Sequence, residues 1–153
     1  MPQFSYKSFA QLSTLELHTI YALRAKVFVV EQHCPYQDID GTDITCFHLQ
    51  LLNNQNLIAY ARIIPPGAHH NYCKIGRVLT APEQRGKSFG RAIMQEAIVC
   101  CKKLYMHADI VISAQAYLVA FYQSFGFIIE GKPYDEDGIP HVQMRLNSVL
   151  STQ

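Results

Sequence analysis

The segment 78–94 holds the residue types that are best suited to binding a phosphate group. A β-branched run ends at Pro82, a short basic loop with glycines follows it, and an amphipathic helix begins after the loop. Such a junction points unpaired backbone N–H groups and the positive end of a helix dipole toward one place. Phosphate oxygens bind well there, and Arg85, Lys87 and Arg91 add positive charge. The sequence therefore predicts a phosphate-binding loop.

This loop is compatible with two known phosphate-binding motifs. Residues 81–88 read A-x-x-x-x-G-K-S, which departs from the P-loop of nucleotide hydrolases at its first glycine. Residues 85–90 resemble the Arg-x-x-Gly-x-Gly loop of the GCN5-related N-acetyltransferases (GNATs), with Ser88 where that family usually has glycine. Too little chain follows Ser88 for the several further βα units of a P-loop domain, and no apolar strand ends in an Asp that would bind magnesium. The context therefore favours the acetyltransferase loop.

A second segment strengthens this resemblance. Residues 113–127 are similar to the second cofactor motif of the same family, Asn-x-x-Ala-x-x-x-Tyr-x-x-x-Gly-Phe. Gln115 stands where Asn is usual, and Tyr122 follows at the family's spacing. Gly126 can take a positive φ and end a helix, so that Phe127 begins a strand. The two motifs together, in this order, are far more specific than either one alone.

The resemblance extends over nearly the whole chain, from about residue 23 to residue 144. Residues 23–32, 38–43, His48 and 134–142 resemble the ElaA-type subfamily of these acetyltransferases. This resemblance implies one α/β (α+β) domain over residues 1–153 with the GNAT fold, in which a mixed six- to seven-stranded sheet has splayed central strands and helices on both faces. It also implies acetyl-CoA as cosubstrate and an amine as acceptor. No metal is expected, because the cysteines and histidines show no C-x₂-C spacing.

The resemblance places cofactor contacts in three parts of the chain. Glycines in the loop let the backbone approach the pyrophosphate without a Cβ in between. The strand before the loop would run beside the pantetheine arm if it splays from its neighbour, and an ordinary central strand is the alternative. The predicted cofactor-binding residues are Val78, Leu79, Thr80, Arg85, Gly86, Lys87, Ser88, Phe89, Gly90, Arg91, Gln115 and Tyr122.

Acyl transfer to an amine requires one proton donor and one proton acceptor. Amine attack on a thioester expels a CoA thiolate, and Tyr122 is the predicted general acid that protonates it. The alternative is a tyrosine that packs beside Phe121 and Phe125. Glu31, which is expected to be partly buried with a raised pKa, and His48, which titrates near neutrality unaided, are the first candidates for the base. The further candidates are Asp40, Asp43 and His141.

Charged residues also occur at positions that the hydrophobic pattern places inside the protein. Arg24 and Arg62 are expected to pair with the acidic residues of segment 38–43, since interior arginines are rarely left unpaired. The same acids would favour a cationic acceptor if they line its site. The predicted acceptor-site residues are Arg24, Phe28, Asp40, Arg62 and His141.

Two other functions remain open at this level. Arg24, Phe28, Asp40, Asp43 and Arg62 also resemble residues of the acyl-homoserine lactone synthases, which share the fold and use S-adenosylmethionine. The intact loop at residues 85–90 favours CoA over an acyl carrier protein. The third alternative is a CoA-binding protein that has lost catalysis.

Bulk composition narrows the remaining classes. The chain of 153 residues carries a formal net charge of +1, which gives no reason to expect nucleic acid or an anionic membrane as partner. No apolar run approaches the roughly 20 residues of a membrane span, and no apolar signal core is present, so a cytoplasmic protein is expected. Five cysteines without regular spacing fit reduced thiols. A homodimer is an open alternative to a monomer.

Secondary-structure signals place these residues on alternating elements. Ser13 and Glu16 form a capping box that begins a helix over residues 14–28, and apolar residues at helical spacing predict a second helix from Phe89 to Leu104. Strands are predicted over residues 4–9, 47–52, 57–64, 74–80 and 109–113, from residue 127, and over 141–146.

Overall fold

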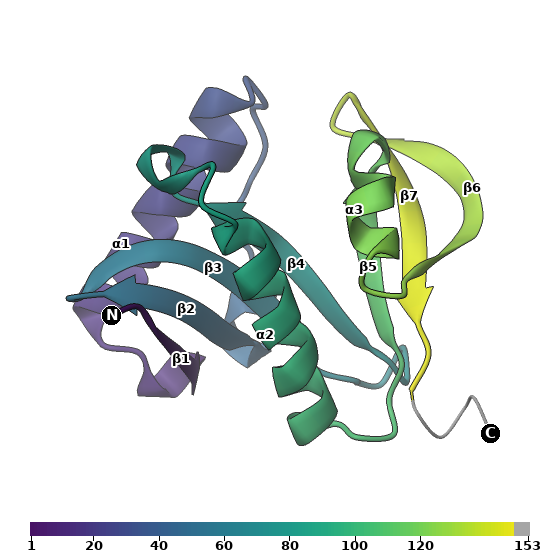
Figure 1. Cartoon of the computed structure of the whole chain (residues 1–153), viewed down its shortest axis with the longest axis horizontal. Coiled ribbons are helices and arrows are strands. Elements are labelled where there is room, and N and C mark those ends of the chain that lie inside the picture. The colour runs from purple at the N-terminus through teal and green to yellow at the C-terminus, as the bar shows by residue number, and fades with distance from the viewer. Residues whose placement is uncertain (149–153) are drawn as a thin grey trace.

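The computed structural model describes residues 1–148, so the last five residues of the predicted domain lie outside it. Within the described residues, seven strands form one mixed sheet (Figure 1). The strands are β1 (Gln3–Ser8), β2 (Phe47–Asn53), β3 (Asn56–Ile64), β4 (Cys73–Thr80), β5 (Ile110–Gln115), β6 (Ile128–Glu136) and β7 (Ile139–Leu146). The α-helices are α1 (Thr14–Arg24), α2 (Phe89–Leu104) and α3 (Val119–Gln123). Shorter helical turns are η1 (Phe9–Gln11), η3 (Gly41–Thr45), η4 (Pro82–Gln84) and η5 (Ala116–Leu118), and η2 (Ala25–Glu31) is a π-helix.

The strand order is β1-β2-β3-β4-β5-β7-β6, and β4–β5 is the parallel pair among otherwise antiparallel neighbours. In the described chain, β4 and β5 pair only at Cys73–Ile110 and Lys74–Val111. Beyond these residues the two strands separate, as Figure 1 shows between α2 and α3. The predicted mixed sheet with splayed central strands is confirmed.

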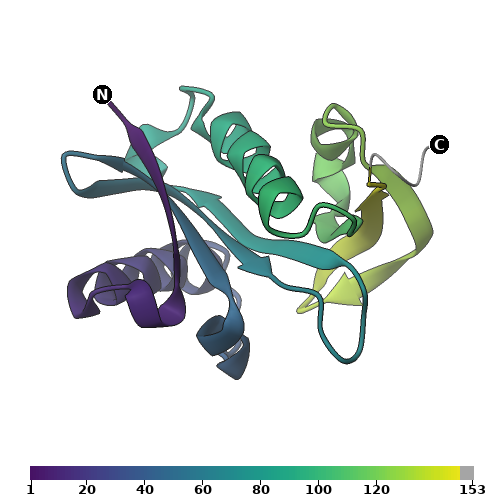
Figure 2. The ribbon, with the colours of Figure 1, turned by 90° about the horizontal axis from the view of Figure 1, so that it is seen from below.

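Helices cover both faces of this sheet, which was also predicted. Figure 2 shows α2 and α3 on one face, and α1 with η2 on the other. On the α2 face, the main core joins α2 residues such as Ile93 and Ala97 to β3, β4, β5 and β7. A smaller core on the α1 face joins Ile20, Val27, Tyr60 and Leu79. On that face α1 and η2 cover β2 to β4. Figure 2 shows no helix beneath β5, β7 and β6 there.

Local signals fixed the start of α1 more closely than its end. The Ser13 hydroxyl accepts the Glu16 N–H at 3.0 Å while the Glu16 carboxylate accepts the Ser13 N–H at 2.9 Å, as the capping box predicts. The predicted helix over residues 14–28 instead ends as an α-helix at Arg24 and continues as the π-helix η2 to Glu31. A wider turn keeps the apolar side against the sheet, so hydrophobic spacing alone does not distinguish it from an α-helix.

Candidate active site

The loop between β4 and α2 presents a row of free backbone donors. The backbone N–H groups of residues 86–91 donate no hydrogen bond to any described residue. Gly86 (φ +81°) and Ser88 (φ 64°) both take left-handed backbone conformations, which turn successive N–H groups outward before α2 begins. A Cβ on Gly90 would lie 3.6 Å from Thr80 Oγ1, so the first turn of α2 lies against the end of β4. The donors and the separated strand are therefore adjacent.

The basic side chains around this loop already have partners. Arg85 Nη2 lies 2.6 Å from Glu31 Oε1, which joins the loop to the end of η2. Lys87 Nζ donates to Gln84 Oε1 at 3.3 Å. Arg91 Nη2 donates to Ser124 Oγ at 2.7 Å, and its guanidinium lies 4.6 Å from the centre of the Phe125 ring. Arg91 thus connects the first turn of α2 to the end of α3 across the splay.

Tyr122 lies on α3, among aromatic side chains of the main core. Its ring makes edge-on contacts with Phe121 at 5.2 Å and Phe127 at 6.3 Å between centroids. Its hydroxyl makes no hydrogen bond to a described residue, and burial raises the pKa of the phenol to about 12. The phenol is therefore protonated at neutral pH, as a proton donor must be. Gln115, the other residue taken from the second motif, ends β5 opposite His141.

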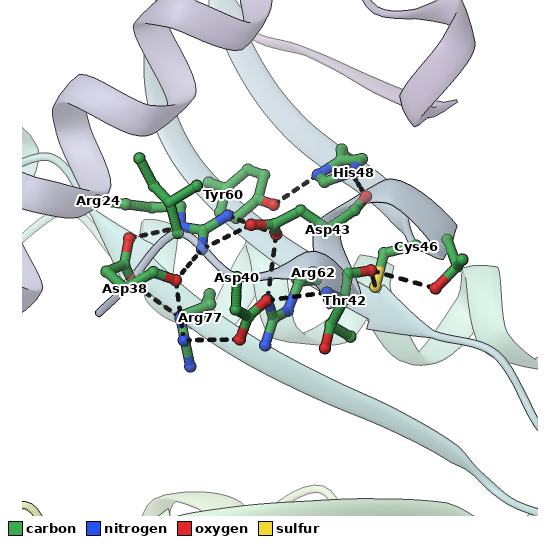
Figure 3. A network of polar contacts seen from close by, with 12 residues as sticks. Arg24, Asp38, Asp40, Thr42, Asp43, Cys46, His48, Tyr60, Arg62 and Arg77 are labelled. Carbon is green, nitrogen blue, oxygen red and sulfur yellow. Dashed lines mark hydrogen bonds and ion pairs between the residues drawn. The ribbon is translucent and has the colours of Figure 1, made fainter. Parts of the chain in front are cut away.

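On the other face, a buried ionic cluster joins three arginines to three aspartates (Figure 3). Arg24 Nη1 lies 2.7 Å from Asp43 Oδ1, and Arg24 Nε lies 3.0 Å from Asp38 Oδ2. Arg62 Nη1 lies 2.8 Å from Asp40 Oδ1 and 3.1 Å from Asp43 Oδ1. The predicted pairing of the two interior arginines with the 38–43 acids is confirmed.

Arg77 of β4 completes this cluster, and the sequence reading missed it. Arg77 Nε lies 2.7 Å from Asp38 Oδ1, and Arg77 Nη2 lies 3.5 Å from Asp40 Oδ2. The register between β3 and β4 shifts beside it, and its φ of 51° is left-handed, so a bulge turns its side chain toward the acids. Gly76, which directly precedes Arg77 inside the strand, is the one local signal of a bulge in the sequence, and the left-handed position itself is held by an arginine.

The cluster corrects the predicted acceptor roles of Arg24 and Arg62. Arg24 is fully buried and Arg62 nearly so, and three positive side chains face three negative ones. Burial opposes ionisation of Asp43, but hydrogen bonds from Arg24 and Arg62 outweigh it and lower the pKa of Asp43. The acids are therefore neutralised internally, and they do not form the open acidic rim that was expected. Asp40 alone keeps a partly exposed side chain.

Neither leading candidate for the base has the environment that was expected of it. His48 is fully buried: its Nε2–H donates to the Asp43 carbonyl at 2.9 Å, and its Nδ1 accepts from the Tyr60 hydroxyl at 2.7 Å. Burial lowers the pKa of His48, so it stays neutral but cannot reach a substrate. Glu31 was expected to be buried with a raised pKa, yet it is exposed, and its hydrogen bond with Arg85 lowers that pKa.

The two other predicted acceptor-site residues lie on the α1 face. Phe28 packs against the smaller core beside Leu79. His141 is nearly buried on β7, where its Nδ1–H donates to the Ile139 carbonyl at 2.7 Å and its Nε2 lies 3.2 Å from Glu136 Oε2. Within residues 1–148, no group of three or more His, Cys, Asp or Glu side chains is arranged to hold a metal ion. No described helix is both long and apolar enough to cross a membrane.

Comparison with protein families agrees with this architecture. The model of the acetyltransferase (GNAT) domain matches residues 16–148. The chain therefore belongs to the GNAT acetyltransferase family. This result, with the mixed sheet order, overturns the P-loop alternative, which requires a parallel doubly wound domain.

Individual relatives place the chain more closely. It is 42% identical over 137 residues to protein ElaA of Escherichia coli, covering 88% of this chain and 90% of ElaA. The crystal structure of ElaA superposes with a TM-score of 0.88 at 39% identity, covering 95% of this chain and 99% of that one. An acyl-CoA N-acyltransferase from Pseudomonas aeruginosa gives a TM-score of 0.91 at 37% identity, with coverage of 95% and 99%. The resemblance to the ElaA-type subfamily is thus confirmed.

The acyl-homoserine lactone synthases share the fold at much lower identity. The CoA-dependent synthase BjaI, whose structure holds S-adenosylmethionine and isopentyl-CoA, gives a TM-score of 0.80 at 14% identity. The match covers 96% of this chain and 84% of that one. A likeness at this identity shows the common fold alone.

Proposed function

We propose that this protein is an N-acetyltransferase that moves the acetyl group of acetyl-CoA to an amine by direct attack. The observation that best supports this proposal is that β4 separates from β5 next to the free N–H groups of residues 86–91. The unpaired edge of β4 and these loop N–H groups follow one another along the chain, so one extended cofactor could bind to both. The pyrophosphate would accept hydrogen bonds from residues 86–91, at the positive end of α2. The pantetheine arm would bond to the free edge of residues 78–80 as an added strand does.

In the proposed reaction, Tyr122 of α3 protonates the leaving group. The amine, once deprotonated, attacks the thioester carbon with its lone pair, and the C–S bond then breaks. The thiolate takes a proton from Tyr122, whose hydroxyl is free of other partners among the described residues and whose pKa is raised to about 12 by burial. His48 is fully buried and Glu31 is paired with Arg85, so we assign the proton of the amine to neither.

The cofactor and the reaction are tested separately. Calorimetry with CoA is expected to give a Kd in the micromolar range, about 7–8 kcal/mol. A thiol-release assay with acetyl-CoA and a panel of primary amines and peptide amino termini then detects turnover. Absence of CoA binding, with tight magnesium-dependent binding of ATP, would refute the cofactor assignment. Binding without release of thiol on any acceptor would instead favour a non-catalytic CoA-binding protein.

Replacement of Tyr122 by Phe tests the proposed acid. The variant loses one hydroxyl and little volume, so packing against Phe121 and Phe127 should survive. Turnover should fall by about 100-fold or more while the affinity for acetyl-CoA stays nearly unchanged. A rate close to that of the wild type would leave Tyr122 as a packing residue.

The lactone-synthase alternative rests on residues that the structure explains differently. Arg24, Asp43 and Arg62 neutralise one another inside the ionic cluster, so their resemblance to lactone-synthase residues does not favour that reaction. Incubation with acyl-CoA and S-adenosylmethionine would distinguish the two functions. Release of methylthioadenosine would favour the synthase, and we expect none.

A further inference from the structure

A polar array occupies the α1 face of β5, β7 and β6, on the half of the sheet that no helix covers in Figure 2. Its members are Ser113, Tyr134, Glu136 and His141. Ile112 and Ala114 belong to the main core beneath α2, so the intervening Ser113 side chain points to the opposite face. Ser113 follows the last β4–β5 pair, which Val111 makes, and so it borders the opened part of the splay.

Tyr134 spans this array from one edge of the sheet. It lies on β6 opposite His141 of β7, and its ring stacks on the imidazole with centroids 6.2 Å apart and planes inclined by 23°. The Tyr134 hydroxyl hydrogen-bonds with the Ser113 hydroxyl of β5, one strand further on. A register shift between Glu130 and Tyr134, with Gly131 at φ +86°, permits this crossing. The phenol therefore points across β7 toward the splay.

The platform under Tyr134 is rigid. His141 contacts its own strand and β6, because Nδ1 lies 2.7 Å from the Ile139 carbonyl oxygen and Nε2 lies 3.2 Å from the Glu136 carboxylate. The stacked ring and the Ser113 contact then hold the phenol in one position. A hydroxyl held in this way can orient a ligand at little further entropic cost.

The segment that follows η2 contacts the turn beside this array. Cys34, which follows η2, donates its thiol to the Asp137 carbonyl at 3.6 Å, and Asp137 lies in the turn between β6 and β7. The array therefore lies between the separated strands and this contact. Asp135 and Glu136 at the end of β6 and Asp137 in the turn lie at the surface, and negative charge there attracts cations.

We propose that Tyr134, held by Ser113 and His141, binds the acceptor, and that the acceptor is a cationic primary amine. This inference rests on the proposed acetyl transfer. An ammonium N–H donates to the Tyr134 oxygen, the Tyr134 proton moves to Ser113 Oγ, and the Ser113 proton passes to water. The freed nitrogen lone pair then attacks the thioester carbon. Tyr134 takes the proton of the amine on one face of β5, and Tyr122 supplies a proton to sulfur on the other.

Conservative variants test the role of this hydroxyl. Tyr134→Phe should raise the KM for the best amine of the panel about tenfold and also lower kcat, because phenylalanine can neither bind the ammonium nor relay its proton, while the Kd for CoA stays unchanged. Ser113→Ala should change the KM in the same direction by a smaller factor. Tyr6→Phe is the matched control, since Tyr6 is 44% exposed on β1 against 40% for Tyr134. An unchanged acceptor KM in Tyr134→Phe would overturn the proposal.

A binding measurement separates this inference from the reaction itself. Cadaverine is titrated into the CoA-saturated, nitrogen-15-labelled protein, and amide shifts are followed by NMR. Shifts at Ser113 and Tyr134 that need about tenfold more cadaverine in Tyr134→Phe would support the amine site even if no acceptor is turned over. Shifts confined to other residues, or identical titrations of both proteins, would refute it.

Discussion

Two polar regions adjoin β4, the ionic cluster and the loop at residues 86–91, and they differ in whether their polar groups are paired. In the ionic cluster, every arginine meets aspartates at close range, and Arg24, Arg62, Asp38 and Asp43 are buried while Asp40 and Arg77 reach the surface. In the loop at residues 86–91, the backbone donors meet no described partner and face outward. Satisfied charges in the interior organise the fold, because any loss leaves an unpaired ion. Unsatisfied donors at the surface are available to a ligand, because binding completes their hydrogen bonds.

The largest effect is expected at the loop. Gly90→Glu places a side chain and a negative charge where the pyrophosphate would lie, so CoA binding should be lost in calorimetry. The fold should survive, because a Cβ at this position makes only an ordinary contact of 3.6 Å with Thr80 Oγ1. Gly90→Ala is the control and should keep most of the affinity. Retained CoA binding in Gly90→Glu would show that the loop does not hold the pyrophosphate.

The next effect is expected in the cluster. Asp43→Asn removes the charge that Arg24 and Arg62 share, and urea unfolding should show a loss on the order of 3 kcal/mol. Glu31→Gln removes an equally short but exposed ion pair with Arg85, and it should leave the unfolding midpoint unchanged. Equal losses of unfolding free energy in the two variants would show that the buried ion pair contributes no more to stability than the exposed one.

Mild acid should lower the free energy of unfolding through His48, which hydrogen-bonds the backbone carbonyl of Asp43 beside the cluster. His48 has a lowered pKa in the folded protein, so its neutral form stabilises the fold above the unfolded value near 6.5. As pH falls below about 6.5 the unfolded chain binds this proton first, and the free energy of unfolding should drop by up to about 1.4 kcal/mol per pH unit. Protonation of Asp43 adds a further loss below about pH 3.8. In urea titrations, His48→Gln should flatten the slope of the free energy of unfolding against pH between pH 6.5 and 5. An unaltered slope would show that another group causes the pH dependence.

The smallest effect separates backbone strain from contacts in the loop. Ser88 holds a left-handed conformation (φ 64°) that costs a non-glycine residue about 1 kcal/mol. Ser88→Gly should therefore stabilise the fold by up to about 1 kcal/mol. Gly86→Ala should destabilise it by a similar amount, because Gly86 has φ +81° while its Cβ would meet no atom within 4 Å. Thermal unfolding that moves both variants the same way would contradict this account.

Short-range chemistry was readable from the sequence. The Ser13–Glu16 capping box, the left-handed Gly86 and the helix stop at Gly126 (φ +100°) all depend on residues within one turn of each other. The family resemblance added the sheet with splayed strands, and the pairing of Arg24 and Arg62 with nearby acids followed from the cost of an unpaired interior charge.

Only the tertiary structure decided which side chains are buried and which distant side chains they contact. Arg85 meets Glu31, His48 meets Tyr60 and Tyr134 meets Ser113 across distant parts of the chain, so no local pattern records these contacts. Exposure of Glu31 and burial of His48 contradicted the environments expected for them, and irregularities in the sheet turned Arg77 inward and carried Tyr134 across β7. The β3–β4 irregularity adds one residue to β4 between Gly76 and Leu79, which changes the face that a side chain occupies, whereas the β6–β7 irregularity adds two residues to β6 between Glu130 and Tyr134. Sequence spacing records the face that a regular strand would present, whereas the bulged sheet determines the actual one.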